Sequence, residues 1–216
     1  MGRLTVVLAD DHTLVRQGVR RILQADGEIG VVGEAGDGLA AVELVRQLHP
    51  TVAIVDIGLP LLNGIDAAAQ MAKVDPAVKI VILSMHGDVA YVRRSLKAGA
   101  HGYVLKDADD LDLVRAVKAV AGGGSFFSPA VSSLLRESFL APEAPATDDA
   151  LAILTDRERQ VLQLIAEGRS SKEIASLLDI SIHTAESHRK RVMEKLDLHN
   201  TAELVRFAIR SRILEA

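Results

Sequence analysis

Five short runs rich in valine, isoleucine and leucine recur in the first half of the chain, and each is followed by a segment with helical periodicity. The runs are Thr5–Ala9, Val31–Glu34, Val52–Val55, Ile80–Leu83 and Gly102–Leu105. Runs that are apolar almost throughout are typical of parallel strands buried on both faces, and the helical segments supply the crossovers that such strands need. The pattern therefore predicts a five-stranded parallel sheet of the doubly wound, flavodoxin-like (βα)5 type.

The alternation ends at Gly122–Gly124, and no strand pattern returns after it. A short helical stretch, Pro129–Glu137, precedes residues 141–149, whose proline, alanine and acidic residues have no periodicity and indicate an extended linker. Four helices are predicted beyond the linker: Asp156–Glu167, Lys172–Leu178, Ile182–Leu196 and Ala202–Arg210. The expected organisation is an α/β domain over residues 1–122, a linker with a short helix over 123–148, and an all-α four-helix domain over 149–214.

Helix ends in the second half are marked by capping residues. Thr155 with Glu158, and Ser170 with Glu173, have the spacing of capping boxes, in which two side chains satisfy the free amides of a helix start. Gly168 supplies the conformational freedom needed just after a helix.

The composition excludes several classes of protein. Cysteine is absent, which excludes a disulfide-stapled scaffold, a thiolate zinc site and a cysteine nucleophile. No apolar run approaches the roughly 20 residues that cross a bilayer, and the first apolar run meets Asp10 and Asp11 too soon for a signal peptide. We expect a cytoplasmic protein with no membrane partner.

Polar side chains follow four of the five predicted strands. Asp10 and Asp11 follow the first, Asp56 the third, Ser84 the fourth and Lys106 the fifth. Ligands of open parallel sheets bind outside the carboxyl ends of the strands, so we expect these side chains to converge on one edge.

Clustered carboxylates repel one another and require a compensating cation. Oxygen donors without cysteine favour a hard ion, and we expect Mg²⁺. A carboxylate beside Mg²⁺ and a lysine is suited to accept a phosphoryl group, whose oxygens the metal ion, Lys106 and the hydroxyl of Ser84 would stabilise.

The chain resembles the bacterial two-component response regulators, specifically the NarL/FixJ subfamily that pairs a receiver domain with a LuxR-type helix-turn-helix. The segments that carry the resemblance are Val7–His12, Val55–Pro60, Leu83–Ser84, Gly99–Lys106 and Leu154–Glu158.

The resemblance implies that Asp56 accepts a phosphoryl group from a sensor histidine kinase and thereby controls DNA binding and transcription. It implies no enzyme activity beyond the receiver's own phosphorylation and dephosphorylation. The other roles it implies are Mg²⁺ ligation by Asp10 (through water), Asp11, Asp56 and the backbone carbonyl of Gly58, and a switch pair of Ser84 and Tyr103. We expect His12, His49, His86 and His101 to be structural or surface residues.

The helices Lys172–Leu178 and Ile182–Leu196 are separated by a short turn and predict a helix-turn-helix whose second helix lies in a DNA major groove. Helical phase directs Ile182, Ala185, Val192 and Leu196 toward the core. The resemblance carried by Thr184–His188 and by Lys195 with Leu196 supports this assignment. We expect DNA contacts from Lys172, His183, Thr184, Glu186, Ser187, His188, Lys190, Arg191 and Lys195.

Individual roles follow from the chemistry of these side chains. Glu186 is repelled by phosphates unless it finds a donor, and cytosine N4 is the obvious one. Lys190 would contact guanine or a phosphate, whereas Arg189, Arg191 and Lys195 would contact the backbone. His188 lies between the two faces and would pack or contact a phosphate.

The last predicted helix has apolar surface that its own domain would not cover. The side chains concerned are Leu204, Val205, Ala208 and Ile209. By resemblance this helix forms a homodimer on DNA, which would read inverted-repeat half-sites, with RNA polymerase as a further candidate partner.

Two alternatives remain open from the residues. A Mg²⁺-dependent phosphatase or transferase also uses an aspartate nucleophile at a strand end, and turnover of a phosphate ester would reveal one. A constitutive DNA-binding regulator could use its receiver as a scaffold only, and then acetyl phosphate would add no mass to the chain.

Overall fold

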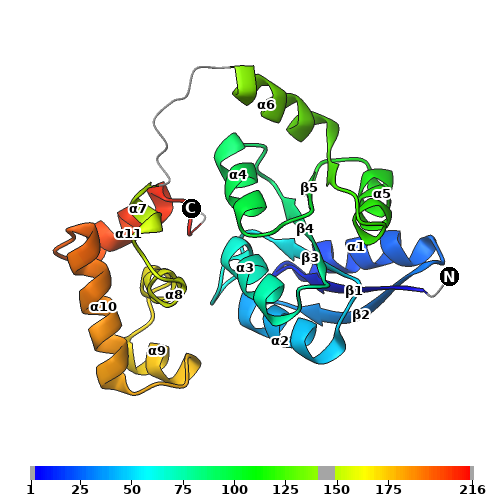
Figure 1. Ribbon diagram of the computed structural model, residues 1–216. Helices are drawn as coiled ribbons and strands as arrows, with labels where there is room; N and C mark the ends of the chain where they lie inside the picture. The colour runs from blue at the N-terminus through cyan, green and yellow to red at the C-terminus, as the bar shows by residue number, and fades with distance from the viewer. Residues whose placement is uncertain (1–2, 141–148, 215–216) are drawn as a thin grey trace. The chain divides into compact units, whose positions relative to one another are not determined.

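The computed structural model describes residues 3–140 and 149–214, and its contacts divide the chain near residue 142 into two compact units. The first unit contains the sheet, and the second contains only helices in its described part (Figure 1). The separation of an α/β unit from a C-terminal helical unit agrees with the sequence pattern.

The sheet is parallel throughout and has the strand order β2-β1-β3-β4-β5-β6. Its strands are β1 (Leu4–Ala9), β2 (Ile29–Ala35), β3 (Val52–Asp56), β4 (Lys79–Ser84), β5 (Gly102–Leu105) and β6 (Phe126–Phe127). The first five strands confirm the doubly wound fold. The prediction of five strands is wrong by one, because β6 has only two residues and therefore no alternation that a sequence could display.

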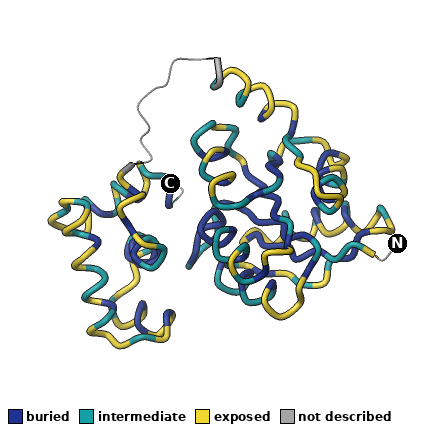
Figure 2. The backbone as a smooth tube through the Cα atoms, viewed as in Figure 1, coloured by how far each residue is buried: buried dark blue, intermediate teal, exposed yellow. Residues whose placement is uncertain are grey.

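Helices cover both faces of the sheet. One face carries α1 (Thr13–Ala25) and α5 (Asp110–Ala121), and the other carries α2 (Gly38–Leu48), α3 (Gly64–Val74), α4 (Val89–Lys97) and α6 (Pro129–Leu140). Alternate strand residues enter the two cores, so Leu8 and Ile54 pack toward α1 and α5 while Val55 and Ile82 pack toward the other face. Figure 2 shows the strands as the most deeply buried part of this unit.

The segment from β6 through α6 packs on the α/β unit rather than crossing to the next domain. Phe127 pairs with Tyr103 of β5, and the backbone N–H of Ser128 donates to the Tyr103 carbonyl oxygen at 3.1 Å. Val131 of α6 is fully buried in the same core as Tyr103. The compact unit therefore extends past residue 122, the predicted end of the α/β domain, and includes part of the predicted linker 123–148. Residues 141–148 of that linker lie outside the described residues.

The helical unit contains the four predicted helices and one more short one. These are α7 (Asp149–Ala152), α8 (Asp156–Ala166), α9 (Ser171–Leu177), α10 (Ile182–Leu196) and α11 (Thr201–Arg210). Both predicted capping boxes are present, at the starts of α8 and α9. Gly168 adopts a φ of +84°, which explains a glycine between these two helices.

Candidate functional site

The predicted polar residues meet at the carboxyl edge of the sheet. β1 and β3 are neighbours with Ala9 opposite Val55, which brings Asp10, directly after β1, beside Asp56 at the end of β3. Ser84 ends β4, and Lys106 follows β5 directly. Residues separated by almost the whole α/β unit in sequence therefore share one edge, as predicted.

Lys106 lies between two buried carboxylates. Its Nζ is 2.9 Å from Oδ2 of Asp10 and 2.9 Å from Oδ2 of Asp56, and both aspartates are at most 5% exposed. Burial opposes the charge of the lysine, but the contacts with Asp10 and Asp56 outweigh it and raise the pKa of Lys106. Lys106 is therefore positively charged at neutral pH. Its single charge faces the two carboxylates of Asp10 and Asp56.

The remaining acidic residue lies at the rim. Asp11 is exposed, and its Oδ1 is 2.7 Å from Nδ1 of His12. Ligand atoms of Asp10, Asp11, His12 and Asp56 all lie within 4.8 Å of one another. The excess of carboxylates over Lys106 and the oxygen-rich donor set fit a hard divalent cation such as Mg²⁺. His12 belongs to this group, and its side chain is exposed, as expected for a surface residue.

Ser84 and Tyr103 lie on the α4 side of the same edge, joined through His86. The backbone N–H of His86 donates to Oγ of the buried Ser84 at 2.9 Å, and the Tyr103 hydroxyl donates to the His86 carbonyl oxygen at 2.6 Å. The His86 ring stacks on Tyr91 with centroids 4.8 Å apart. One residue of the β4–α4 loop thus connects both members of the predicted switch pair, and the Tyr103 ring is inward, at 1% exposure.

Sequence reasoning missed the residue that shapes the turn after Asp56. A Cβ on Gly64 would lie 1.9 Å from the Asp56 carbonyl oxygen, and the Gly64 N–H donates to the Ile57 carbonyl oxygen at 2.8 Å. Only glycine permits this approach, which fixes the loop that contains Gly58. The signal available in the sequence was the pair Asn63 and Gly64, since Asn63 also caps α3.

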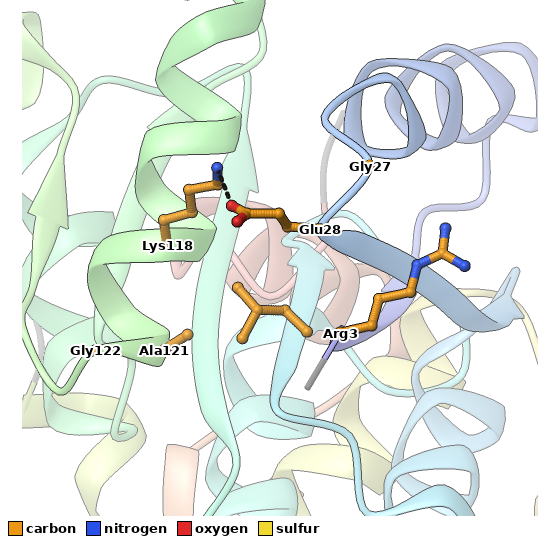
Figure 3. Close-up of a pocket in the computed structure, with 7 residues that line it drawn as sticks. Arg3, Gly27, Glu28, Lys118, Ala121 and Gly122 are labelled. Carbon is orange, nitrogen blue, oxygen red and sulfur yellow. Dashed lines mark hydrogen bonds and ion pairs between the residues drawn. The ribbon is translucent and has the colours of Figure 1, made fainter. Parts of the chain in front are cut away.

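A separate cavity of about 620 Å³ lies at the opposite, amino edge of the sheet, between the end of α5 and the starts of β1 and β2 (Figure 3). Its charged lining residues are Arg3, Glu28 and Lys118, and the Nζ of Lys118 is 2.6 Å from Glu28 and 2.9 Å from Asp26. Hydrogen bonds to Glu28 and Asp26 raise the pKa of Lys118. None of the predicted site residues lines this cavity.

The second candidate site is the outer surface of α10. Ala185 and Val192 are buried, as the helical phase predicts, whereas Ile182 is 48% exposed and Leu196 half-buried. The inward assignment of Ile182 is therefore wrong: the core contacts of α10 begin at Ala185. The exposed DNA-contact candidates on α9 and α10 are Lys172, His183, Glu186, Lys190, Arg191 and Lys195, and Thr184, Ser187 and His188 are half-buried.

Lys195 and Arg189 of α10 contact residues of other elements of their own domain, whereas Lys190 lies 3.7 Å from Glu194 of the same helix. Lys195 Nζ is 2.7 Å from Oε2 of the buried Glu158 and also donates to the Ile153 carbonyl oxygen at 3.1 Å. Arg189 Nη2 donates to Oγ1 of Thr201 at 2.7 Å. These contacts argue against the predicted backbone contacts of Lys195 and Arg189, and give Lys195 a place in the capping of α8.

His188 is half-buried and lies near two arginines. Burial, together with the nearby Arg157 and Arg191, lowers its pKa. Its Nδ1 is buried without a hydrogen-bond partner among the described residues. Arg157 itself donates to the Leu178 carbonyl oxygen at 2.8 Å and ties α8 to the end of α9.

The predicted dimer helix, α11, is largely used inside the domain. Leu204 and Ala208 are fully buried, so they cannot contact a second copy, and including them in a dimer surface is wrong. Val205 is half-buried and Ile209 is 37% exposed, and these two remain available. The correction arises because a helical stripe of apolar residues covers its own domain before it covers another.

Known families match both units. Residues 6–118 match the response regulator receiver domain, and residues 152–208 match the bacterial regulatory proteins of the luxR family. None of the helices in the described ranges combines the length and apolar composition needed to cross a membrane.

Similar proteins align over nearly the whole chain. The transcriptional regulatory protein MctR of Rhizobium johnstonii is 40% identical, over 96% of this chain and 94% of its own. The oxygen regulatory protein NreC of Staphylococcus carnosus is 37% identical, over 98% of this chain and 100% of its own. A solved complex of the two-component response regulator RcsB with DNA is 31% identical with a TM-score of 0.60, and the match covers 97% of this chain and 99% of that one.

The acidic edge that Lys106 bridges lies within the receiver match, and the helix-turn-helix of α9 and α10 lies within the luxR match. The receiver match lies in the first compact unit, and the luxR match lies in the second. The chain therefore belongs to the two-component response regulators that join a receiver domain to a LuxR-type DNA-binding domain.

Proposed function

We propose that Asp56 is the phosphoryl acceptor of this regulator and that its phosphorylation by a sensor histidine kinase controls DNA binding by α10. The observation that carries the proposal is the position of Asp56, a buried carboxylate 2.9 Å from Lys106 at the carboxyl edge of the sheet. In the transfer, the P–N bond of a phosphohistidine breaks, an oxygen of Asp56 forms the new P–O bond, and the imidazole nitrogen takes up a proton.

The residues of this chain would assist the transfer by position and charge. Lys106 would stabilise charge on the phosphoryl oxygens, and Ser84, whose Oγ accepts from His86, keeps its own proton to donate to one of them. Asp10, Asp11, Asp56 and the Gly58 carbonyl would hold Mg²⁺, which neutralises charge on the phosphoryl group when bound.

The phosphoryl group would act at a distance through the β4–α4 loop. His86 contacts both Ser84 and Tyr103, so a movement of the Ser84 hydroxyl toward the phosphoryl group changes both contacts of one residue. A switch requires two states with different contacts, and the contacts of His86 with Ser84 and Tyr103 would be the ones that differ between them.

DNA is the proposed target of α10, by analogy with the RcsB–DNA complex. Glu186, Ser187 and Lys190 would contact bases, while Lys172 and Arg191 would contact the backbone, with His183, Thr184 and His188 at the edge of the interface. A homodimer would contact two half-sites, with Val205 and Ile209 as the part of α11 available to a second copy.

The test is mass and affinity measured on the same samples. Acetyl phosphate with Mg²⁺ should add the mass of one phosphoryl group to the wild-type chain, and a chelator should prevent the addition. Asp56→Asn keeps the shape of the side chain and should show no addition. DNA affinity, measured by fluorescence anisotropy, should change on phosphorylation of wild type only.

Labelling of Asp56→Asn at the wild-type rate would refute the acceptor assignment. Phosphorylation without any change in DNA affinity or oligomeric state would refute the switch and favour a constitutive regulator with a scaffold receiver.

A further inference from the structure

Ile182 occupies a position that the packing of its own domain does not explain. It is the first residue of α10 and is 48% exposed, whereas the inward side of the helix is filled by Ala185 and Val192. A β-branched residue is a modest helix former, and exposed apolar surface contributes little to folding. Nearly half of the Ile182 surface therefore remains accessible to a partner outside its own domain.

The side chain lies in line with the proposed base contacts. Residues four apart share one face of a helix, so Ile182, Glu186 and Lys190 form a single stripe, and all three are exposed. The first turn is fixed because Ser181 Oγ accepts from the backbone N–H of Thr184 at 3.0 Å. The stripe therefore begins with an apolar side chain on a well-defined turn.

We propose that Ile182 contacts the C5-methyl group of a thymine in the major groove and so sets a base preference at one position of each half-site. The second helix of a helix-turn-helix presents its N-terminal residues to base edges, and this is where Ile182 lies. An aliphatic side chain forms no hydrogen bond with a phosphate or a base edge. The thymine methyl is the apolar group that the major groove offers it.

This inference rests on the proposed function, because it requires α10 in the groove. It adds a specificity residue to the polar ones. Glu186 and Lys190 recognise hydrogen-bonding groups, whereas Ile182 would recognise the presence of a methyl group.

The experiment removes the methyl group from the DNA instead of from the protein. Sites are first selected from random duplexes with the full wild-type chain, and each thymine of the selected site is then replaced in turn by deoxyuridine, which retains every hydrogen-bonding group. At one thymine per half-site, wild type should lose about fourfold in affinity, the value expected for one buried methyl group. Ile182→Ala should bind the thymine and deoxyuridine duplexes equally.

Ile153→Ala is the matched control, because Ile153 is 49% exposed in the same unit and lies outside the helix-turn-helix. It should keep the full wild-type sensitivity to deoxyuridine. The circular dichroism spectrum of Ile182→Ala, and its change on heating, should match those of wild type, which would show that the variant folds normally.

Equal sensitivity of wild type and Ile182→Ala at every thymine would overturn the inference while leaving DNA binding intact. A wild-type chain that selects no sequence at all would instead refute the proposed function, and this inference with it.

Discussion

Replacing Lys195 by methionine should destabilise the DNA-binding unit. The contact that is lost lies inside the unit and does not involve DNA. Glu158 is 4% exposed, and its Oε2 accepts from the Thr155 backbone N–H at 2.8 Å, the Thr155 hydroxyl at 3.0 Å and Lys195 Nζ at 2.7 Å. The lysine is the only charged member of this set. Methionine keeps the aliphatic stem and leaves the buried carboxylate with neutral donors.

The magnitude follows from the burial of the two partners. Removing one partner of a fully buried ion pair costs about 3–5 kcal/mol. The Lys195 side chain is 38% exposed, so solvent screens part of its charge, and the expected loss in free energy of unfolding is about 1–3 kcal/mol. That loss corresponds to a roughly 5- to 150-fold increase in the equilibrium constant for local unfolding of the unit.

Hydrogen exchange on the full chain measures this directly. Peptides from α8 and α10 should lose protection in Lys195→Met, while peptides from the sheet act as an internal reference. Lys172→Met is the matched control, because Lys172 is an exposed lysine on the adjacent helix α9.

The pH dependence has a defined sign. Burial opposes ionisation of Glu158, but the contacts with Lys195 and Thr155 outweigh it and lower its pKa. Such a group stabilises the folded state above the ordinary carboxyl pKa of 4.5, and the contribution is lost as pH falls through the lower folded pKa. The protection of amide hydrogens in wild type should therefore decrease as the pH falls through this window. The decrease should be less steep in Lys195→Met.

A double variant, Glu158→Gln with Lys195→Met, separates the ion pair from the cap. Glu158→Gln should cost less in the Lys195→Met background than in wild type. Additive losses, or equal protection in Lys195→Met and Lys172→Met, would contradict the reasoning.

Three further outcomes are expected. Arg191→Ala should weaken binding to all duplexes alike and lower the salt slope by about one unit, whereas Lys195→Met should leave the slope unchanged; salt titrations of DNA affinity check both. Glu186→Ala should raise non-specific affinity and reduce discrimination at one base position by about 1–3 kcal/mol, and unchanged preferences in a binding-site selection would contradict its role. Val131→Ala should destabilise the α/β unit by about 2 kcal/mol in denaturant unfolding followed by the tyrosines, with the exposed Ser133→Ala as control.

The acidic edge could be predicted because the carboxyl ends of parallel strands lie together at one edge of the sheet. Asp10, Asp56 and Lys106 each follow a run that is recognisable by composition, and the doubly wound topology places the ends of those runs together. The contacts between them required the structure. The sequence shows neither that Lys106 bridges both aspartates nor that Gly64 allows the approach to Asp56.

The errors have a common physical origin in contacts between distant segments. The sequence between the glycines and the linker contains a short helical pattern, but the burial of Val131 against the core around Tyr103 depends on the pairing of β6 with β5. Likewise, the basic stretch of α10 gives no sign of Glu158 on another helix. Local chemistry identifies charged residues, whereas their partners are set by packing.

The division of the basic residues of α10 bears on how this regulator would distinguish DNA sequences. Arg189 and Lys195 contact Thr201 and Glu158 on other helices, while Lys190 and Arg191 are exposed. Lys190 lies 3.7 Å from an exposed partner on its own helix, Glu194. In a chain whose net charge is −4, few cations of this helix then remain for phosphates, so counterion release should contribute modestly to affinity. Discrimination would then depend more on the side chains that we propose to contact bases. An exposed isoleucine and an exposed glutamate on that stripe are consistent with this, because neither side chain gains from the phosphate backbone and both gain only from particular bases.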